Sequence, residues 1–341
     1  MDNSEIVVEA NEPVKAKKSK EELRRDRELD RSVVNFSKKN ISSLGIVGVH
    51  PEHNVLYLSS ETYVKIYSLK GVALSLTRRD VLINALCGFT PHRLRLSSFL
   101  YPSSDASVVF LSVFFKGKRF SEVADEIQEF DRNLSLLMTG RFKLSFTPIS
   151  IGDAFMFIFM NYRGQMKNIS TRAVLKKNVN FKRDFLREIV EDNDSFKVLE
   201  DNKYGFVNMC LQYPEKFEEN FFERLKKIGV GYLSCIDFQR IETDMDQSYK
   251  KMIEASYNSD IENNEDKNVN ATFILSMLFE EKGQLDLGYS LAKDIFADSG
   301  LVMVPCNGIQ TEVFPSLATF GLVDFHCMRR VTIDILANLI G

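Results

Sequence analysis

The stretch "KYGFVNMCLQYPEKFEENFFERLKKIGVGYLSCIDFQRIET" (Lys203–Thr243) contains the clearest secondary-structure pattern in the chain. An apolar run over Lys203–Tyr213 predicts a strand, and Pro214 then stands where the first turn of a helix tolerates proline. A second strand is expected over Gly231–Arg240. The helix between the strands should end at Gly229, and its apolar residues lie on one face: Phe217, Phe221, Phe222 and Leu225. A strand, a helix and a strand of this kind predict half of a ferredoxin-like unit.

The part of the chain before this stretch predicts a similar mixture of strands and helices. "LGIVGVH", "NVLYLSS" and "TYVKIYSLKGV" indicate an antiparallel meander, and a helix capped by Thr77 should follow and end at Gly88. "HRLRLSSFLYP" and "ASVVFLSVFF" predict two strands before a helix that Ser121 should cap and Gly140 should end. "GDAFMFIFMNYRG" predicts a buried helix. The fold class is therefore α+β, with mainly antiparallel sheets.

The same patterns divide the chain into a charged flexible arm, two α+β units and a last helix. The second unit should include a helical insertion near residues 258–297, formed by helices over Ala271–Glu281 and Leu285–Ala297 after an acidic loop. The four predicted segments are residues 1–35, 36–165, 170–324 and 325–341.

The N-terminal arm is dense in charges of both signs, as in "KAKKSKEELRRDRELDR" (residues 15–31). Such a run is typical of a solvated segment. The alternative is a short helix that docks on a partner or on anionic lipid through its Lys and Arg side chains. With too few apolar residues to build a core, the arm should be dispensable for folding.

Composition narrows the range of functions. The net charge is −3, whereas a dedicated duplex-DNA binder is usually basic, so direct sequence-specific binding to nucleic acid is not expected. The five Cys residues are far apart and form no CxxC pair, which is typical of buried, reduced thiols in the cytosol. The sequence contains no apolar run long enough to cross a bilayer and no signal-peptide pattern.

Motifs that carry chemistry are missing from the sequence. GxxxxGK[ST], GxGxxG and GxSxG do not occur. His50 and His53 in "HPEHN" fit a hairpin turn better than a zinc site, and Asp324, His326 and Cys327 should point in different directions on one helix. For "HRLRLSSFLYP", we favour an edge strand with one polar face over a surface that binds single-stranded nucleic acid. No catalytic, cofactor-binding or metal-binding residue is predicted.

The order of features nevertheless resembles the N-terminal region of the conjugation ATPases of type IV secretion, in the form found on Gram-positive mobile elements. The resemblance covers roughly residues 40–341 and rests on pattern and order. It is carried by "LGIVGVHPEHNVLYLSSETYVKIYSLKGV", "VVFLSVFFKGKRFSEVADEIQEFDRNL", "YPEKFEENFFERLKKIG" and "MRRVTIDILANLIG". In that family the Walker motifs follow this region, so the resemblance implies a missing ATPase domain that would bind ATP and Mg²⁺.

The resemblance implies a docking and oligomerisation domain at the cytoplasmic face of the cell membrane. Its expected partners are the ATPase domain or subunit of the same machine, inner-membrane secretion components and further copies of itself. The interdomain contact should come from the last helix, with part of its apolar stripe exposed, through Arg329, Arg330, Val331, Ile335, Leu336 and Leu339. Two alternatives stay open: a stand-alone structural or interaction protein of a phage or mobile element, and an enzyme whose site is assembled from scattered residues.

Overall fold

The computed structural model describes most of the chain after its first residues. The described residues are 18–36, 45–70, 76–101, 107–163, 167–176, 188–199, 201–214, 220–241, 268–323, 325 and 327–340. The sequence DMDQSYKKMIEASY (residues 244–257), which has a helical pattern, lies outside these ranges, and so do the acidic loop that follows it and residues 1–17 of the arm. The fold is α+β, as the sequence predicts.

The first unit has the strand and helix order of a ferredoxin-like domain, which the sequence analysis did not identify there. Its sheet order is β7, β4, β6 and β5, with every neighbouring pair antiparallel. Its elements are β4 (Thr62–Lys70), α2 (Leu76–Phe89), β5 (Arg93–Leu100), β6 (Val108–Lys116), α3 (Phe120–Ser135) and β7 (Ser145–Pro148). A π-helical turn, η2 (Leu136–Phe142), extends α3 and ends at Lys143, whose backbone is left-handed.

The second unit repeats this order and confirms the predicted ferredoxin-like pattern. Its sheet order is β13, β10, β12 and β11, again antiparallel throughout. Its elements are β10 (Lys203–Gln212), α7 (Phe221–Lys226), β11 (Tyr232–Arg240), β12 (Asn268–Phe279), α9 (Lys282–Asp298) and β13 (Val302–Pro305).

The likeness between the units extends beyond these six elements. A hairpin precedes each unit: β2 (Ile46–His50) with β3 (Val55–Leu58) before the first, and β8 (Ile189–Asp192) with β9 (Ser195–Val198) before the second. The second strand of each hairpin pairs with the first strand of its unit, β3 with β4 and β9 with β10. A helix follows each unit, α4 (Ile151–Arg163) in the first and α10 (Gln310–Ala318) in the second. Both hairpins turn through a left-handed asparagine, Asn54 or Asn193. The predicted meander of β2, β3 and β4 is confirmed.

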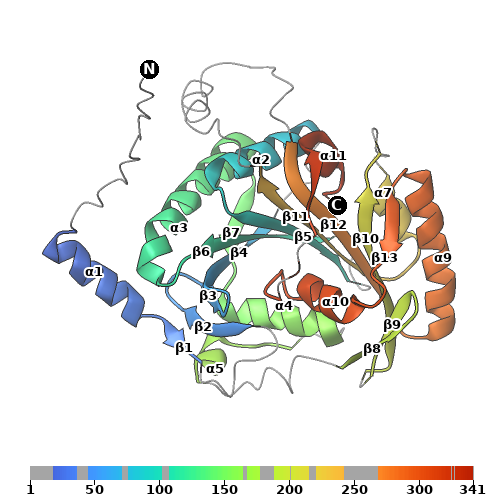
Figure 1. Cartoon of the computed structure of the whole chain (residues 1–341), viewed down its shortest axis with the longest axis horizontal. Coiled ribbons are helices and arrows are strands. Elements are labelled where there is room, and N and C mark those ends of the chain that lie inside the picture. Colours follow the sequence, from blue (N-terminus) through green and yellow to red (C-terminus); the bar gives the residue numbers. More distant parts are fainter. Residues whose placement is uncertain are drawn as a thin grey trace, which may run out of the picture.

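The two units join edge to edge into one sheet, because β5 pairs with β11 along its length (Figure 1). One face of this sheet packs against α2, α3, α7 and α9, and the other against α4 and α10. The pairing crosses the predicted boundary near residues 165–170, so the hydrophobic core runs through both units.

The terminal segments fold back onto this frame. β14 (Arg329–Thr332) pairs with the first half of β12, and α11 (Ile333–Asn338) packs on α2. At the other end, α1 (Lys20–Arg31) lies beside α3, and β1 (Val34–Asn35) pairs with β2. A further short helix, α5 (Thr171–Leu175), contacts α4. For residues 20–31 the structure therefore has the short helix that was the alternative to a solvated arm.

Four sequence predictions are wrong. Ser121 does not cap α3, because it lies within the helix, whose N-cap is Arg119. The helix over Ala271–Glu281 is strand β12, whose two faces are both buried, so apolar residues occur on both faces and hide the period of two. "HRLRLSSFLYP" contains β5, which is a central strand and is buried at all eight positions. The predicted last helix is a strand over Arg329–Thr332 followed by a six-residue helix.

Candidate functional site: the buried junction between the two units

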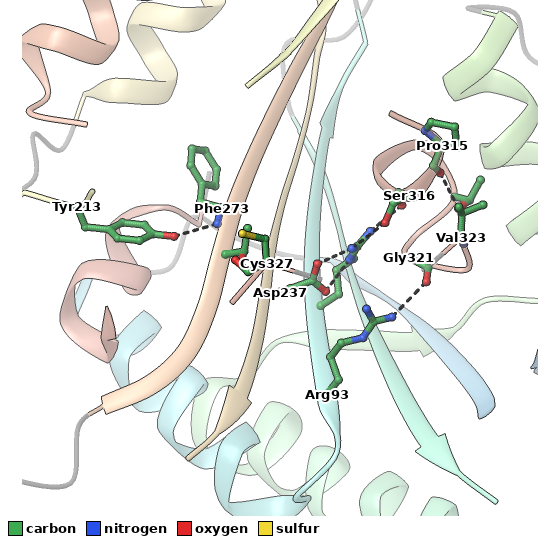
Figure 2. Close-up of polar contacts among 12 residues, drawn as sticks. Arg93, Tyr213, Asp237, Phe273, Pro315, Ser316, Gly321, Val323 and Cys327 are labelled. Carbon is green, nitrogen blue, oxygen red and sulfur yellow. Dashed lines mark hydrogen bonds and ion pairs between the residues drawn. The ribbon is translucent and has the colours of Figure 1, made fainter. Parts of the chain in front are cut away.

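Two charged side chains meet in the interior where the two units join. Arg95 on β5 is fully buried, and Asp237 on β11 is 2% exposed. They occupy opposed positions in the strand pairing, so their side chains emerge on the same face of the sheet. Arg95 Nε donates to Asp237 Oδ1 at 2.8 Å, and Nη2 donates to Oδ2, which makes the ion pair bidentate (Figure 2).

The same guanidinium also holds the helix that covers this face. Arg95 Nη1 donates to the main-chain oxygen of Ser316 at 2.6 Å, and Nη2 donates to the Ser316 hydroxyl at 3.1 Å. Ser316 belongs to α10, close to Pro315, which interrupts the helical hydrogen-bond pattern. One arginine thus connects the first unit, the second unit and α10.

A tight turn after α10 completes the contact. Arg93 Nη2 donates to the Gly321 oxygen at 3.2 Å, and its guanidinium lies 3.7 Å from the centre of the Phe114 ring. Gly321 has φ +82°, and a Cβ there would lie 2.8 Å from Arg95 Cζ, so the turn requires glycine. Phe320 beside it is also left-handed, with φ +57°. Figure 2 shows Arg93 reaching from the sheet toward Gly321 in this turn.

Neighbouring polar contacts tie further elements to the junction. The Asn161 amide on α4 donates to the Ala318 oxygen at 2.8 Å and accepts from the Tyr101 hydroxyl at 2.9 Å. The Thr272 hydroxyl on β12 donates to the Cys327 oxygen, which fixes the chain just before β14. Each bond satisfies a buried polar group, as a dry interior requires.

Little open space lies near the junction among the described residues. A hollow of about 10 Å³ lies on the opposite face, among Ser98, Ser234 and Ile340, and its volume suits about one water molecule. Both carboxylate oxygens of Asp237 are already used in hydrogen bonds to the buried guanidinium of Arg95. The described contacts therefore hold the two units and α10 together.

The structure also shows where the histidines and cysteines considered in the sequence lie. His50 and His53 lie next to each other, with ring centres 4.7 Å apart, but His50 packs against Phe120 in the interior. Within the described ranges, no group of three His, Cys, Asp or Glu side chains could hold a metal ion. Asp324 and His326 lie outside the described residues. Four thiols are buried as predicted, and burial raises the pKa of each to about 12: Cys87, Cys210, Cys235 and Cys306.

The expected interdomain residues divide into two groups. Val331, Leu336 and Leu339 are at most 5% exposed and belong to the core of this chain, so the exposed part of the predicted stripe does not include them. Ile335 is half-buried, and Arg330 is exposed. Arg329 is exposed too, and its Nη1 donates to the Leu211 oxygen at 3.2 Å. Their role in an interdomain contact stays a prediction.

Sequence reasoning missed Arg95 and Asp237. Two arginines spaced by two in "HRLRL" were a usable signal, because they share one face of a strand and a buried face demands a counter-charge. The sequence does not indicate which of its many carboxylates supplies that charge.

No protein-family model matches this chain, and no curated protein is significantly similar to it. Among solved structures, a putative monooxygenase from Fusobacterium nucleatum subsp. nucleatum is similar at 8% identity and a TM-score of 0.20, over 73% of this chain and 92% of that one. 6-Hydroxy-D-nicotine oxidase from Arthrobacter nicotinovorans is similar at 12% identity and a TM-score of 0.31, over 74% of this chain and 46% of that one. At these TM-scores neither likeness bears on activity or cofactor.

Proposed function

We propose that this chain is a docking and oligomerisation module of a conjugative, type IV secretion ATPase, and that it links the motor to the inner-membrane complex during DNA transfer. The proposal starts from the order of sequence features over residues 40–341, which resembles the front part of these ATPases. We place the module at the cytoplasmic side of the membrane. None of its described helices is both long and apolar enough to cross a bilayer.

The observation that carries the proposal is the junction at Arg95. This side chain bonds to Asp237 and Ser316, so both units and α10 form one frame. A close-packed frame transmits displacement from one surface to another without deforming. A module that holds a motor against a membrane complex needs this property, and a binding function needs no reactive side chains.

The C-terminal segment supports the same function. β14 pairs with β12, and α11 packs on α2, so residues 329–338 have a fixed position on the frame. In the family that the sequence resembles, the ATPase domain follows this segment. A domain joined there would be held relative to the sheet, with ATP and Mg²⁺ bound in that domain. We assign the interdomain contact to Arg330 and Ile335, since the buried members of the predicted set are already in use.

Transfer frequency in a donor cell tests the proposal. Deleting the coding sequence from its mobile element should abolish transfer, and a plasmid copy should restore it. A copy carrying Arg330→Glu should restore a lower transfer frequency, because the reversed charge weakens the proposed contact with the ATPase domain. Lys227→Glu, the matched control at another exposed basic residue, should restore it fully.

Two results would contradict the proposal. Undiminished transfer after the deletion would exclude a role in the machine. Equal complementation by both variants, together with no copurification of the ATPase subunit, would remove the docking role.

A further inference from the structure

The helix α1 carries four basic side chains on one face. They recur at positions i, i+4, i+7 and i+11, a spacing that aligns side chains along a helix. All four are exposed, and Leu23 beside them is 44% exposed. We call this surface the basic face; its members are Lys20, Arg24, Arg27 and Arg31.

Other side chains of α1 attach the helix to the body. The Asp30 carboxylate accepts from the Ser121 N–H at 2.9 Å and from the Ser121 hydroxyl at 3.1 Å, so it satisfies a free donor in the first turn of α3. Arg25 Nη2 donates to Asp125 at 2.6 Å, and Leu29 packs against the core. These contacts hold α1 at the edge of the molecule beside α3 (Figure 1).

The charges of the basic face are largely unneutralised. Of the four members of the basic face, Arg24 alone has an ion pair with a described residue, Glu28 at 3.1 Å, and both side chains are mostly exposed. Such a pair contributes little, because water screens it. Residues 15–31 contain eight Lys and Arg against five Asp and Glu, whereas the whole chain has a net charge of −3. The first fourteen residues add four acidic side chains, so the excess of positive charge belongs to the basic face of α1 and not to the whole N-terminal end of the chain.

We infer that the basic face of α1 docks on a membrane surface rich in anionic phospholipid headgroups. The four charges extend over about 17 Å along the helix, so a helix lying parallel to the surface presents all of them to several headgroups at once. The exposed Leu23 and the aliphatic stems of Lys and Arg suit the boundary between headgroups and acyl chains. This inference rests on residues 18–31 and gives the proposed membrane location a specific surface.

Vesicle cosedimentation with the full chain tests the inference. The chain should bind vesicles of equal parts phosphatidylglycerol and phosphatidylcholine, and should not bind pure phosphatidylcholine. Changing all four members of the basic face to Gln should weaken binding by about 10²–10³-fold, because each removed charge accounts for about fivefold. Rising NaCl should weaken wild-type binding in the same way.

A matched control removes the same number of exposed charges elsewhere. Gln at Arg132, Arg141, Lys176 and Lys227 should leave vesicle binding unchanged. Equal losses in the two variants would overturn the inference, because any positive charge on the chain would then suffice. Tighter binding of a duplex oligonucleotide than of vesicles, lost in the same basic-face variant, would also overturn it by assigning the surface to nucleic acid. If the chain fails to bind anionic vesicles but deletion of its coding sequence still abolishes transfer, this inference is overturned and the proposed docking function is not.

Discussion

Arg95 and Asp237 are 142 positions apart in the chain, yet they form a bidentate ion pair across the seam between the two ferredoxin-like units. The pair lies in the interior, and Ser316 shares the same guanidinium. Removing two charges from water is costly, so this contact persists only because each polar atom has a partner. The two residues stand directly opposite each other in the pairing of β5 with β11, so the ion pair lies where the two units are joined.

Breaking this pair from one side should destabilise the protein severely. Asp237→Leu leaves a buried guanidinium without its counter-charge, which costs about 3–5 kcal/mol in the free energy of unfolding. Arg95→Met combined with Asp237→Leu should recover most of that loss, because no charge stays buried. Urea unfolding of both variants measures the difference. A double variant as unstable as the single one would show that packing, and not charge, dominates the junction.

Gly321 should not tolerate a side chain. Gly321→Ala introduces a Cβ 2.8 Å from Arg95 Cζ at a residue with φ +82°, so we expect a loss of about 1–3 kcal/mol. Gly283→Ala is the matched control, since nothing lies within 4 Å of its Cβ position, and alanine there should be neutral or slightly stabilising. Thermal melting of the two variants compares them. Equal melting temperatures would contradict the close approach at Gly321.

The short helix α11 should belong to the core of this chain. Leu336 is fully buried, so Leu336→Ala should cost about 2–5 kcal/mol through lost burial and the cavity left behind. Leu287→Ala is the same substitution at a residue that is 65% exposed, and it should have little effect. If Leu336→Ala melts like the wild type and abolishes self-association instead, the helix serves an intermolecular contact.

His50 should make stability fall in mild acid. Burial is the main cause that lowers its pKa from 6.5 to about 4, and the neighbouring His53 adds to the shift. Between these values the unfolded chain binds a proton that the folded chain does not, so His50 costs no stability above pH 6.5 and up to about 3 kcal/mol near pH 4. The difference in unfolding free energy between wild type and His50→Phe should change across this window. A constant difference would contradict the prediction.

The chain should neither bind nor hydrolyse ATP. Its sequence lacks a glycine-rich phosphate loop of the Walker type, and little open space lies near the junction at Arg95 among the described residues. Calorimetric titration with MgATP should give no saturable heat, and phosphate release should stay at background. Saturable micromolar binding would revive the alternative of an enzyme with a scattered site.

Local periodicity in the sequence was sufficient to predict the fold class. In the stretch Lys203–Arg240, strand, helix and strand follow from patterns that neighbouring residues set by themselves. The meander over β2, β3 and β4 follows likewise, because short turns make adjacent strands pair. The buried helix α4 was predicted from its composition.

Tertiary structure alone decided the rest, because distant residues supply the partners. β12 is buried on both faces, which removes the alternation that distinguishes a strand from a helix. From its two arginines β5 was predicted to be an edge strand. It is buried because Asp237, Ser316 and Gly321, all distant in the sequence, accept hydrogen bonds from those arginines. α11 looked like an unpartnered helix until α2 covered it. Each of these outcomes depends on which segments meet in the folded chain, and no local sequence pattern encodes that meeting.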